Sequence, residues 1–324
     1  MCKSTAGEGK DSVSFTRWCV GMFCGSIFTL AYILAPPYVF SSILALALRY
    51  PDGNKAFLYA IPLIASILTP ARGMPKVVGL LKPMLSYFKF ECITENEENL
   101  EANLAKGKNY IFACQPHGVI SFCGMCSSVH RDPKYRRIQT AVASSLLKFP
   151  ILKNVMGIFS LTDASSSNLR KVLKRPGIEG SVVIYIGGMA ELFKCCRTEE
   201  RLFLSQRKGF IKLALREGVD IVPIYLFGNT SCLSVMKHGP LARMSRRLKL
   251  SFTLFWGKWF LPIPRDDNLL YVAGKAIEIP KIAEPSQEEI DIYHKKYVDE
   301  VVRIFNTYKS QAGKLYEEKS LFID

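Results

Sequence analysis

The feature that most restricts the fold is an uncharged stretch near the N-terminus. From Trp18 to Ala35 the sequence has no charged residue, Pro36-Pro37 follows, and Tyr38–Leu48 is again uncharged. A second apolar run covers Ala56–Leu68. A helix needs about 20 apolar residues to cross a bilayer, and the first stretch exceeds that length if it continues past the prolines. The sequence therefore predicts a membrane anchor ahead of the globular part.

Two arrangements of this anchor fit the sequence. It forms either a hairpin that turns at Pro36-Pro37 or one kinked span with a shorter re-entrant partner. A helical hairpin buried in a soluble domain is a further interpretation, which the uncharged length disfavours. Arg17 and Arg49 flank the first stretch on opposite sides, so the charges do not set an orientation.

A retained anchor fits this end better than a cleaved signal peptide. The leader is long and contains Glu8 and Asp11, and the small residue Ala35 is followed by two prolines. We therefore expect three parts: a cytosolic tail over residues 1–17, a membrane anchor over residues 18–70 and a cytosol-facing domain over residues 71–324.

The net charge and the positions of the cysteines indicate which partners and which redox environment this domain has. The formal net charge is +15, which favours an anionic partner such as nucleic acid, anionic lipid or a phosphorylated substrate. No nucleic-acid motif is present, so beside an anchor we expect lipid headgroups. Adjacent Cys195-Cys196, and Cys19 and Cys24 inside the apolar stretch, do not form a disulfide scaffold, so reduced thiols are expected. The densest basic cluster consists of Lys237, His238, Arg243, Arg246, Arg247 and Lys249, for which a merely solvated face is the alternative.

Beyond an acidic lead-in that ends near Glu101, short apolar runs alternate with helical patterns. The runs expected as strands are Tyr110–Cys114, Ile138–Ala143, Val182–Ile186, Ile221–Phe227 and Tyr271–Val272. Helical patterns cover Ser165–Lys174 and Arg207–Glu217, and Ser286-Gln-Glu-Glu289 resembles a capping box that opens a last helix. The alternation predicts an α/β fold with a mostly parallel sheet and flanking helices.

Three stretches have the composition of a site. In the first, Pro116, His117 and Gly118 form a turn at the end of an expected strand, where open α/β sheets bind ligands and where a histidine can exchange a proton near neutral pH. The alternative is a histidine that only caps the turn. In the second, Gly187 and Gly188 precede a lone carboxylate, Glu191. If the strands are parallel neighbours, Glu191 lies at the same rim as His117.

The third stretch is basic and opens a helix. It contains Arg207, Lys208, Gly209 and Lys212, and free N–H groups at a helix start also favour anions. Cations at this end oppose the helix dipole, which favours a role in ligand binding over a role in the helix.

A metal site competes for the first stretch. Cys114 and His117, followed by Cys123 and Cys126, have zinc-ligand spacing, but the segment between them is apolar and lacks the pattern of a zinc knuckle. A Cys–His nucleophile pair is a further alternative without a local signature.

Together, Pro116-His117-Gly118, Gly187-Gly188 with Glu191, the block from Arg207 to Gly228, and Val272-Ala-Gly-Lys275 resemble the type 2 diacylglycerol acyltransferase family. The resemblance implies a glycerolipid-acyltransferase-like fold behind a membrane-embedded helical hairpin. It implies an endoplasmic-reticulum enzyme, also found on lipid droplets, that transfers a fatty acyl group from acyl-CoA to diacylglycerol.

On this resemblance, each stretch takes a chemical role. His117 is the expected general base, and Glu191 the expected partner of its other ring nitrogen. The N–H groups of Gly118, Gly188 or a helix start would stabilise the oxyanion, and Arg207, Lys208 and Lys212 would pair with CoA phosphates. No metal or redox cofactor is expected.

Three residues depart from the family pattern. Gln115 replaces the first histidine of His-Pro-His-Gly, and Asn229 replaces the glutamate of Phe-Gly-Glu. Phe122 stands where distant glycerolipid acyltransferases have the aspartate of His-x4-Asp. Monoacylglycerol or a long-chain alcohol is the alternative acceptor, and a non-catalytic lipid-binding protein of membranes or droplets is the alternative class. The retained His117 favours the enzyme, and homo-oligomer formation stays open.

Overall fold

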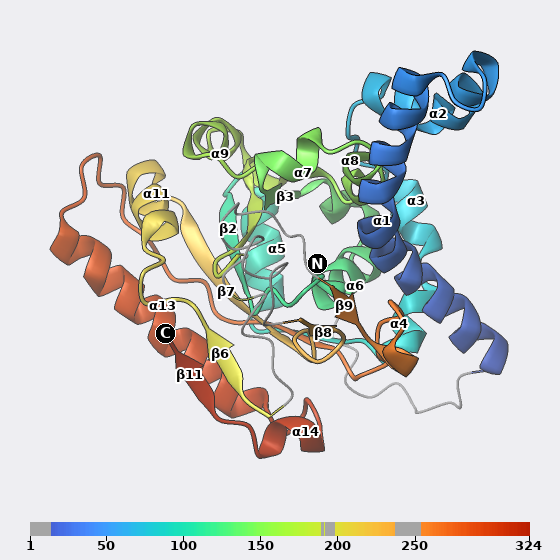
Figure 1. The fold of residues 1–324 in the computed structure, drawn as a ribbon. Helices are drawn as coiled ribbons and strands as arrows, with labels where there is room; N and C mark the ends of the chain where they lie inside the picture. The colour runs from blue at the N-terminus through green and yellow to red at the C-terminus, as the bar shows by residue number, and fades with distance from the viewer. Residues whose placement is uncertain (1–13, 189–190, 192–197, 237–253) are drawn as a thin grey trace.

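The protein is described here by a computed structural model, which covers residues 14–188, 191, 198–236 and 254–324. A mixed seven-stranded sheet lies at its centre, between two layers of helices (Figure 1). In spatial order its strands are β1 (Glu91–Thr94), β10 (Leu270–Ala273), β7 (Asp220–Phe227), β2 (Tyr110–Gln115), β5 (Val182–Tyr185), β3 (Gln139–Val142) and β4 (Leu161–Asp163). From β7 to β4 all neighbours are parallel, whereas β10 runs antiparallel to β7. The predicted mostly parallel α/β fold is confirmed.

All five predicted strands are present, and the strands that the sequence analysis missed among the described residues are short. These are β1, β4 and two small ribbons, in which β6 (Glu200–Leu202) pairs with β11 (Leu321–Ile323) and β8 (Ser234–Val235) pairs with β9 (Phe255–Trp256). Each has only two to four residues, which is too short for a period of two to stand out.

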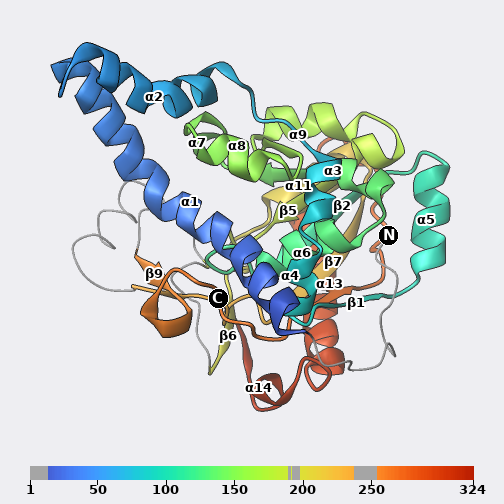
Figure 2. The ribbon, with the colours of Figure 1, turned by 90° about the vertical axis from the view of Figure 1, so that its right-hand side faces the viewer.

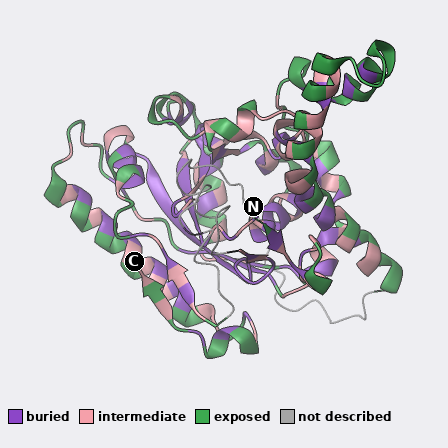
Figure 3. Cartoon of the chain, viewed as in Figure 1, coloured by how far each residue is buried: buried purple, intermediate pink, exposed green. Residues whose placement is uncertain are grey.

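The central strand β2 owes its apolar sequence to burial on both faces. Phe112 and Cys114 belong to one apolar core, and Ile111 and Ala113 belong to the other. Figure 3 shows that buried residues concentrate on the sheet and on the helix faces turned toward it. Buried from both sides, β2 places its C-terminal end in the middle of the domain.

One helical layer contains α4 (Pro83–Tyr87) and α6 (Phe122–His130), with α3 (Pro75–Leu80), α7 (Ser144–Lys148), α8 (Leu152–Gly157) and the 3-10 turn η1 (Pro133–Arg137) beside them. The other contains α9 (Ser166–Leu173), α11 (Gly209–Glu217) and α13 (Gln287–Tyr308). Within the described globular part, the other helices and turns are α5 (Glu97–Ala105), η2 (Gly177–Gly180), η3 (Lys258–Phe260) and α14 (Lys314–Glu317).

The helix boundaries follow the sequence signals. Ser286 and Glu289 form the expected capping box at the start of α13, and Ile290, Tyr297, Val301 and Phe305 are buried along this helix. Gly218 ends α11 in the left-handed conformation with φ 67°.

The N-terminal apolar segment forms two helices, so the expected hairpin that turns at Pro36-Pro37 is wrong, whereas the alternative of one long helix with a shorter partner agrees with the structure. The long helix α1 (Phe15–Leu48) continues through Pro36 and Pro37, and α2 (Gly53–Leu68) packs against it. The turn lies at residues 49–52, where Arg49 has φ 51° and Asp52 caps α2 with its side chain. The left-handed residue and the Asp cap end and restart the helix, whereas the two prolines leave it continuous.

Close contacts join α1 to the globular domain along one side (Figure 2). A Cβ on Gly21 would lie 2.4 Å from the Pro83 carbonyl oxygen of α4, so only glycine permits this approach. Trp18 Nε1 donates to Asp266 over 3.2 Å, and the Thr29 hydroxyl donates to the Pro262 carbonyl. This end of α1 is therefore part of the folded domain.

The opposite side of α1 and much of α2 expose apolar side chains. They include Phe23, Leu30, Leu34, Phe40, Ile43, Phe57, Leu58, Ile61 and Leu68. Among the described helices, α1 is long and apolar enough to cross a membrane.

Six cysteines of the described segments are free thiols, as predicted, namely Cys19, Cys24, Cys114, Cys123, Cys126 and Cys232. Cys92 is the exception, because it is disulfide-bonded. The basic cluster from Lys237 to Lys249, the pair Cys195-Cys196 and most of the N-terminal tail lie outside the described residues.

Candidate active site

Two predicted site residues, His117 and Glu191, meet Asn229 where three neighbouring parallel strands end. His117 follows β2, Glu191 follows β5 and Asn229 follows β7, and β2 pairs with both other strands. The carboxyl ends of adjacent parallel strands open toward one rim, which is where α/β sheets bind ligands. The structure thus brings the first two stretches together, as their positions in the sequence suggested.

Glu191 holds the main chain of the histidine turn. Its Oε2 accepts the His117 backbone N–H over 2.8 Å, and its Oε1 accepts the Phe203 N–H over 3.2 Å. Burial raises the pKa of Glu191 to about 7, and the two N–H donors oppose that rise. The expectation that Glu191 orients the second ring nitrogen is wrong in this respect, because its carboxylate contacts the backbone of the turn.

The glycine pair makes room for this carboxylate. A Cβ on Gly187 would lie 1.9 Å from the Glu191 carboxyl carbon, so any larger residue would displace the side chain. Gly188 has φ 53°, a conformation that side chains disfavour, and its carbonyl accepts the Glu191 N–H. The two glycines therefore fold the chain back so that Glu191 reaches His117.

The His117 ring is held in one tautomer. Its Nδ1 lies 2.8 Å from the Gly118 carbonyl oxygen. A carbonyl only accepts, so Nδ1 carries the proton and Nε2 keeps a free lone pair. The ring also packs edge-on against Tyr185, with centroids 5.0 Å apart. Burial lowers the pKa of His117 below its ordinary value of 6.5, so the ring is neutral at pH 7 and can act as a base.

Pro116 and Gly118 shape the turn around this histidine. The Gln115–Pro116 peptide bond is cis, and Gly118 has φ 66°. A Cβ on Gly118 would lie 2.7 Å from the Asn229 carbonyl oxygen, so this close approach also requires glycine.

Gln115, which replaces the family's first histidine, faces away from the reacting ring. It is fully buried on the α13 side of the sheet, where its Oε1 accepts the Tyr297 hydroxyl. Its Nε2 has no hydrogen-bond partner among the residues that the structure describes. Gln115 therefore links β2 to α13 and leaves His117 as the only imidazole in the turn.

The three predicted cations have separate environments. Arg207 is exposed, stacks on the Phe203 ring at 5.0 Å and lowers the pKa of Glu191 by its charge. Lys208 pairs with Asp291 of α13 over 2.7 Å. Lys212 is exposed on α11, which begins at Gly209 rather than at Arg207. Arg207 is thus the cation that the structure places beside the site.

Neither of the thiol-based alternatives gains support from the geometry. Within the segments that the structure describes, no three His, Cys, Asp or Glu side chains gather as metal ligands, so Cys114, His117, Cys123 and Cys126 do not converge. Burial raises the pKa of Cys114 to about 12, and those of Cys123 and Cys126 also rise. A nucleophilic cysteine requires the opposite shift.

Comparison with known proteins identifies the family of this chain. The sequence model of the family described as diacylglycerol acyltransferase matches residues 56–323. The chain belongs to the diacylglycerol acyltransferase family. It is accordingly an O-acyltransferase, and the matched region contains all three strand ends of the site.

Curated relatives are similar over most of the chain. Diacylglycerol O-acyltransferase 2 of Danio rerio is 30% identical over 262 residues, which cover 75% of this chain and 70% of that protein. The human protein of the same name is 29% identical over 65% of this chain and 59% of its own length. Human diacylglycerol O-acyltransferase 2-like protein 6 is 29% identical over 72% of this chain and 74% of its own.

Among solved structures, a 1-acyl-sn-glycerophosphate acyltransferase from Thermotoga maritima is 14% identical with a TM-score of 0.43. The match covers 89% of this chain and 95% of that chain.

The sequence did not identify two residues that contact the histidine turn. Tyr185 ends β5 and packs against the His117 ring, but as a strand residue it has no distinguishing signal. Asn229 was noticed only as a departure from the family pattern, yet its side chain bonds two carbonyls of the turn and the Cys123 N–H of α6. The replacement of the family's glutamate by Asn229 was therefore the sequence signal that could have identified this residue.

Proposed function

We propose that this enzyme transfers a fatty acyl group from acyl-CoA to the free hydroxyl of diacylglycerol and forms triacylglycerol. The observation that carries the proposal is the neutral His117 at the shared strand ends, with Nδ1 bonded to the Gly118 carbonyl and Nε2 available. The names of the curated relatives support diacylglycerol as the acceptor.

In the proposed reaction, His117 Nε2 takes the hydroxyl proton while the hydroxyl oxygen attacks the thioester carbonyl carbon. The tetrahedral intermediate carries a negative oxygen, for which the N–H groups of Gly118 and Gly188 are the candidate donors. Neither N–H is bonded to another described residue. When the C–S bond breaks, the CoA thiolate leaves and takes the proton back from His117, so the base is regenerated.

Acyl-CoA is the second substrate, and its phosphates need cations. Arg207 is the strongest candidate because it is exposed and lies close to Glu191. Lys212 and the N–H groups at the start of α11, including Gly209, offer further contacts along the same helix. Lys208 would first have to leave Asp291. The proposed reaction requires no metal or redox cofactor.

We also place the α1–α2 hairpin in the endoplasmic-reticulum membrane, with the catalytic domain facing the cytosol and lipid-droplet association as a further location. The exposed apolar side chains of α1 and α2 support contact with membrane lipids. Six free thiols in the described segments fit a reducing cytosolic side, whereas the disulfide-bonded Cys92 does not.

The function is tested by expression in cells that lack triacylglycerol synthesis. Radiolabelled acyl-CoA is supplied with diacylglycerol, monoacylglycerol and fatty alcohol in competition, and labelled triacylglycerol should dominate. The His117→Ala variant should lose the product while it keeps expression and membrane association. Dominant labelling of another acceptor would replace the acceptor assignment, and near-normal activity of His117→Ala would reject the base.

A further inference from the structure

Asn229 bonds the catalytic turn through all the polar atoms of its side chain. Its Nδ2 donates to the carbonyl oxygens of Pro116 over 2.9 Å and of His117 over 2.7 Å. Its Oδ1 accepts the Cys123 N–H over 3.1 Å. The residue is 1% exposed, so water does not compete for these bonds. One side chain therefore ties the histidine turn to the first turn of α6.

The chemistry of these contacts suits a carboxamide and no carboxylate. The two carbonyl oxygens require a donor, and the Cys123 N–H requires an acceptor, which a single amide group supplies together. A carboxylate has two acceptors and no donor, so it would face both carbonyls with negative charge. The glutamate expected from the family pattern at this position would not fit the turn as this chain builds it.

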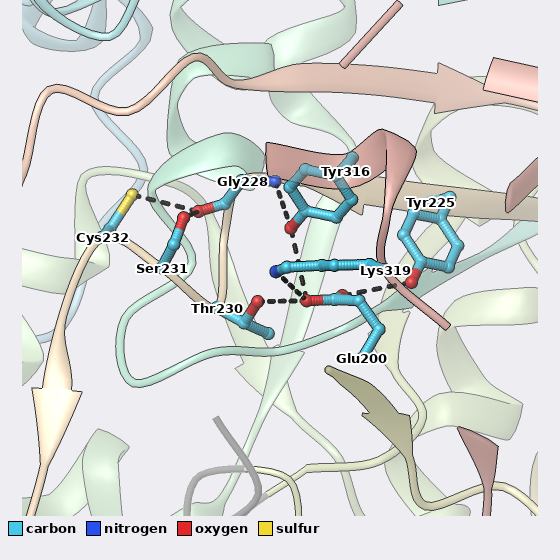
Figure 4. A network of polar contacts seen from close by, with 8 residues as sticks. All are labelled: Glu200, Tyr225, Gly228, Thr230, Ser231, Cys232, Tyr316 and Lys319. Atoms are coloured by element: carbon cyan, nitrogen blue, oxygen red, sulfur yellow. Dashed lines mark hydrogen bonds and ion pairs between the residues drawn. The ribbon is translucent and has the colours of Figure 1, made fainter. Parts of the chain in front are cut away.

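A buried cluster of polar side chains outside the catalytic turn holds the backbone around Asn229. Thr230 donates its hydroxyl to Glu200, and Gly228 donates its N–H to the Tyr316 hydroxyl over 2.7 Å (Figure 4). Lys319 completes the cluster by an ion pair of 3.1 Å with Glu200. Both chain neighbours of Asn229 are thus bonded to groups that do not belong to the catalytic turn. The position of its side chain is therefore imposed from outside the turn.

We propose that Asn229 is the positioning residue of His117, a role that rests on the proposed acyl transfer. Asn229 holds the carbonyls of Pro116 and His117, and the next carbonyl, that of Gly118, holds the ring through Nδ1. Three consecutive carbonyls are thereby engaged. Loss of the Asn229 donor frees the first two, so the peptide that aims Nε2 can rotate away from the attacking hydroxyl.

The test compares Asn229→Asp with the matched control Ser231→Ala. Asp keeps the size of the side chain but removes the donor. Ser231 is buried in the same loop, and its side chain bonds only the Gly228 carbonyl among described residues. At about pH 8 we expect Asn229→Asp to lose about tenfold or more in kcat with KM for acyl-CoA within about twofold, and Ser231→Ala to stay within about threefold of wild type.

The pH dependence separates positioning from general damage. A buried Asp beside two carbonyls regains an O–H donor when it is protonated, so the ratio of variant to wild-type rate should rise from about pH 8 to about pH 6. Because an ionised Asp raises the pKa of His117, the rates are compared after the protonated fraction of His117 has been determined in each enzyme. Asn229→Glu, which introduces the family residue, should lose at least as much activity as Asn229→Asp.

Three results would overturn the role of Asn229 while wild type is active: equal kcat for Asn229→Asp and Ser231→Ala, a pH-independent ratio, or wild-type activity of Asn229→Glu. A wild-type enzyme that transfers no acyl group to any acceptor would instead reject the proposed function.

Discussion

Two ionisable residues of the turn give the reaction separate pH signatures. The pKa of His117 lies below 6.5, whereas burial raises that of Glu191 to about 7. Ionised Glu191 is the better acceptor for the two N–H groups it binds, so we expect kcat/KM to rise through about pH 7 and to have a second acid limb below pH 6.5. Measurement of kcat/KM between about pH 5 and pH 9 checks this.

Glu191→Gln should remove the limb near pH 7, keep the lower one and slow the reaction by about tenfold, because its amide presents a donor to one of the two N–H groups. The unfolding free energy changes with pH in the opposite direction to the rate. Folded Glu191 binds its proton more tightly than the unfolded residue, whose pKa is 4.5. Its contribution to the unfolding free energy is therefore lost as the pH rises from 4.5 to about 7. An unchanged rate and pH profile would restrict Glu191 to a structural role.

A single methyl group at Gly187 should disconnect Glu191 from the turn. The new Cβ of Gly187→Ala would occupy the position of the Glu191 carboxyl group, and we expect a loss of activity as large as that of Glu191→Ala. Gly53→Ala at the start of α2 is the control, since its Cβ would meet nothing within 4 Å and the residue lies outside the site. Acyl-transfer assays on the three variants make the comparison, and full activity of Gly187→Ala would show that Glu191 can be held elsewhere.

At this scale the sequence predicted which residues meet and missed how they touch. His117 and Glu191 could be brought together from the sequence because adjacent parallel strands end at one rim. The Glu191 carboxylate bonds the backbone N–H of His117 and not its ring. This contact depends on how closely the chain folds back at Gly187 and Gly188, a detail of geometry that the sequence pattern does not contain. The role of Asn229 depends on a pairing between β7 and β2 that no local pattern contains.

Among the elements, the contact between α1 and α4 is the most sensitive to side-chain size. Gly21→Ala would force its Cβ against the Pro83 carbonyl and the Tyr87 Cβ, so we expect a loss of about 1–3 kcal/mol in unfolding free energy. Gly53→Ala at the start of α2 is the matched control, because its Cβ would meet nothing within 4 Å. Thermal unfolding in detergent compares the two, and equal midpoints would show that α1 docks loosely.

Element boundaries were predictable where the local signal was strong. The capping box at Ser286 and the glycine cap at Gly218 end or begin helices as their sequences indicate. Pro36-Pro37 misled, because a proline removes a hydrogen bond without ending a helix whose other contacts persist. The turn at residues 49–52 overlaps the polar segment Pro51-Asp-Gly-Asn-Lys55, which separates the two apolar runs in the sequence.

Across the whole molecule, the ion pair between Glu200 and Lys319 joins β6 to the segment between α14 and β11. Both side chains are almost fully buried. Lys319→Met would leave Glu200 as an uncompensated buried charge and should cost about 3–5 kcal/mol, whereas the exposed Lys314→Met should cost little. Thermal unfolding tests this, and Glu200→Gln combined with Lys319→Met should recover part of the loss. No recovery would indicate that packing of the lysine stem, not its charge, is what matters.

The glycine contact of α1 has a consequence for how the enzyme meets its lipid substrate. A domain joined to its anchor by a flexible linker takes many distances from the bilayer surface. A domain packed directly against its anchor helix, as α4 is packed against α1, keeps one distance. With the hairpin in the membrane as proposed, the distance from the lipid surface to His117 is then a constant of the molecule. The hydroxyl of the acceptor must then reach His117 at that fixed distance from the membrane. The acyl chains that hold the acceptor in the membrane would limit how far its hydroxyl extends. Acceptor selectivity would therefore depend on the depth of the acceptor in the bilayer as well as on its shape.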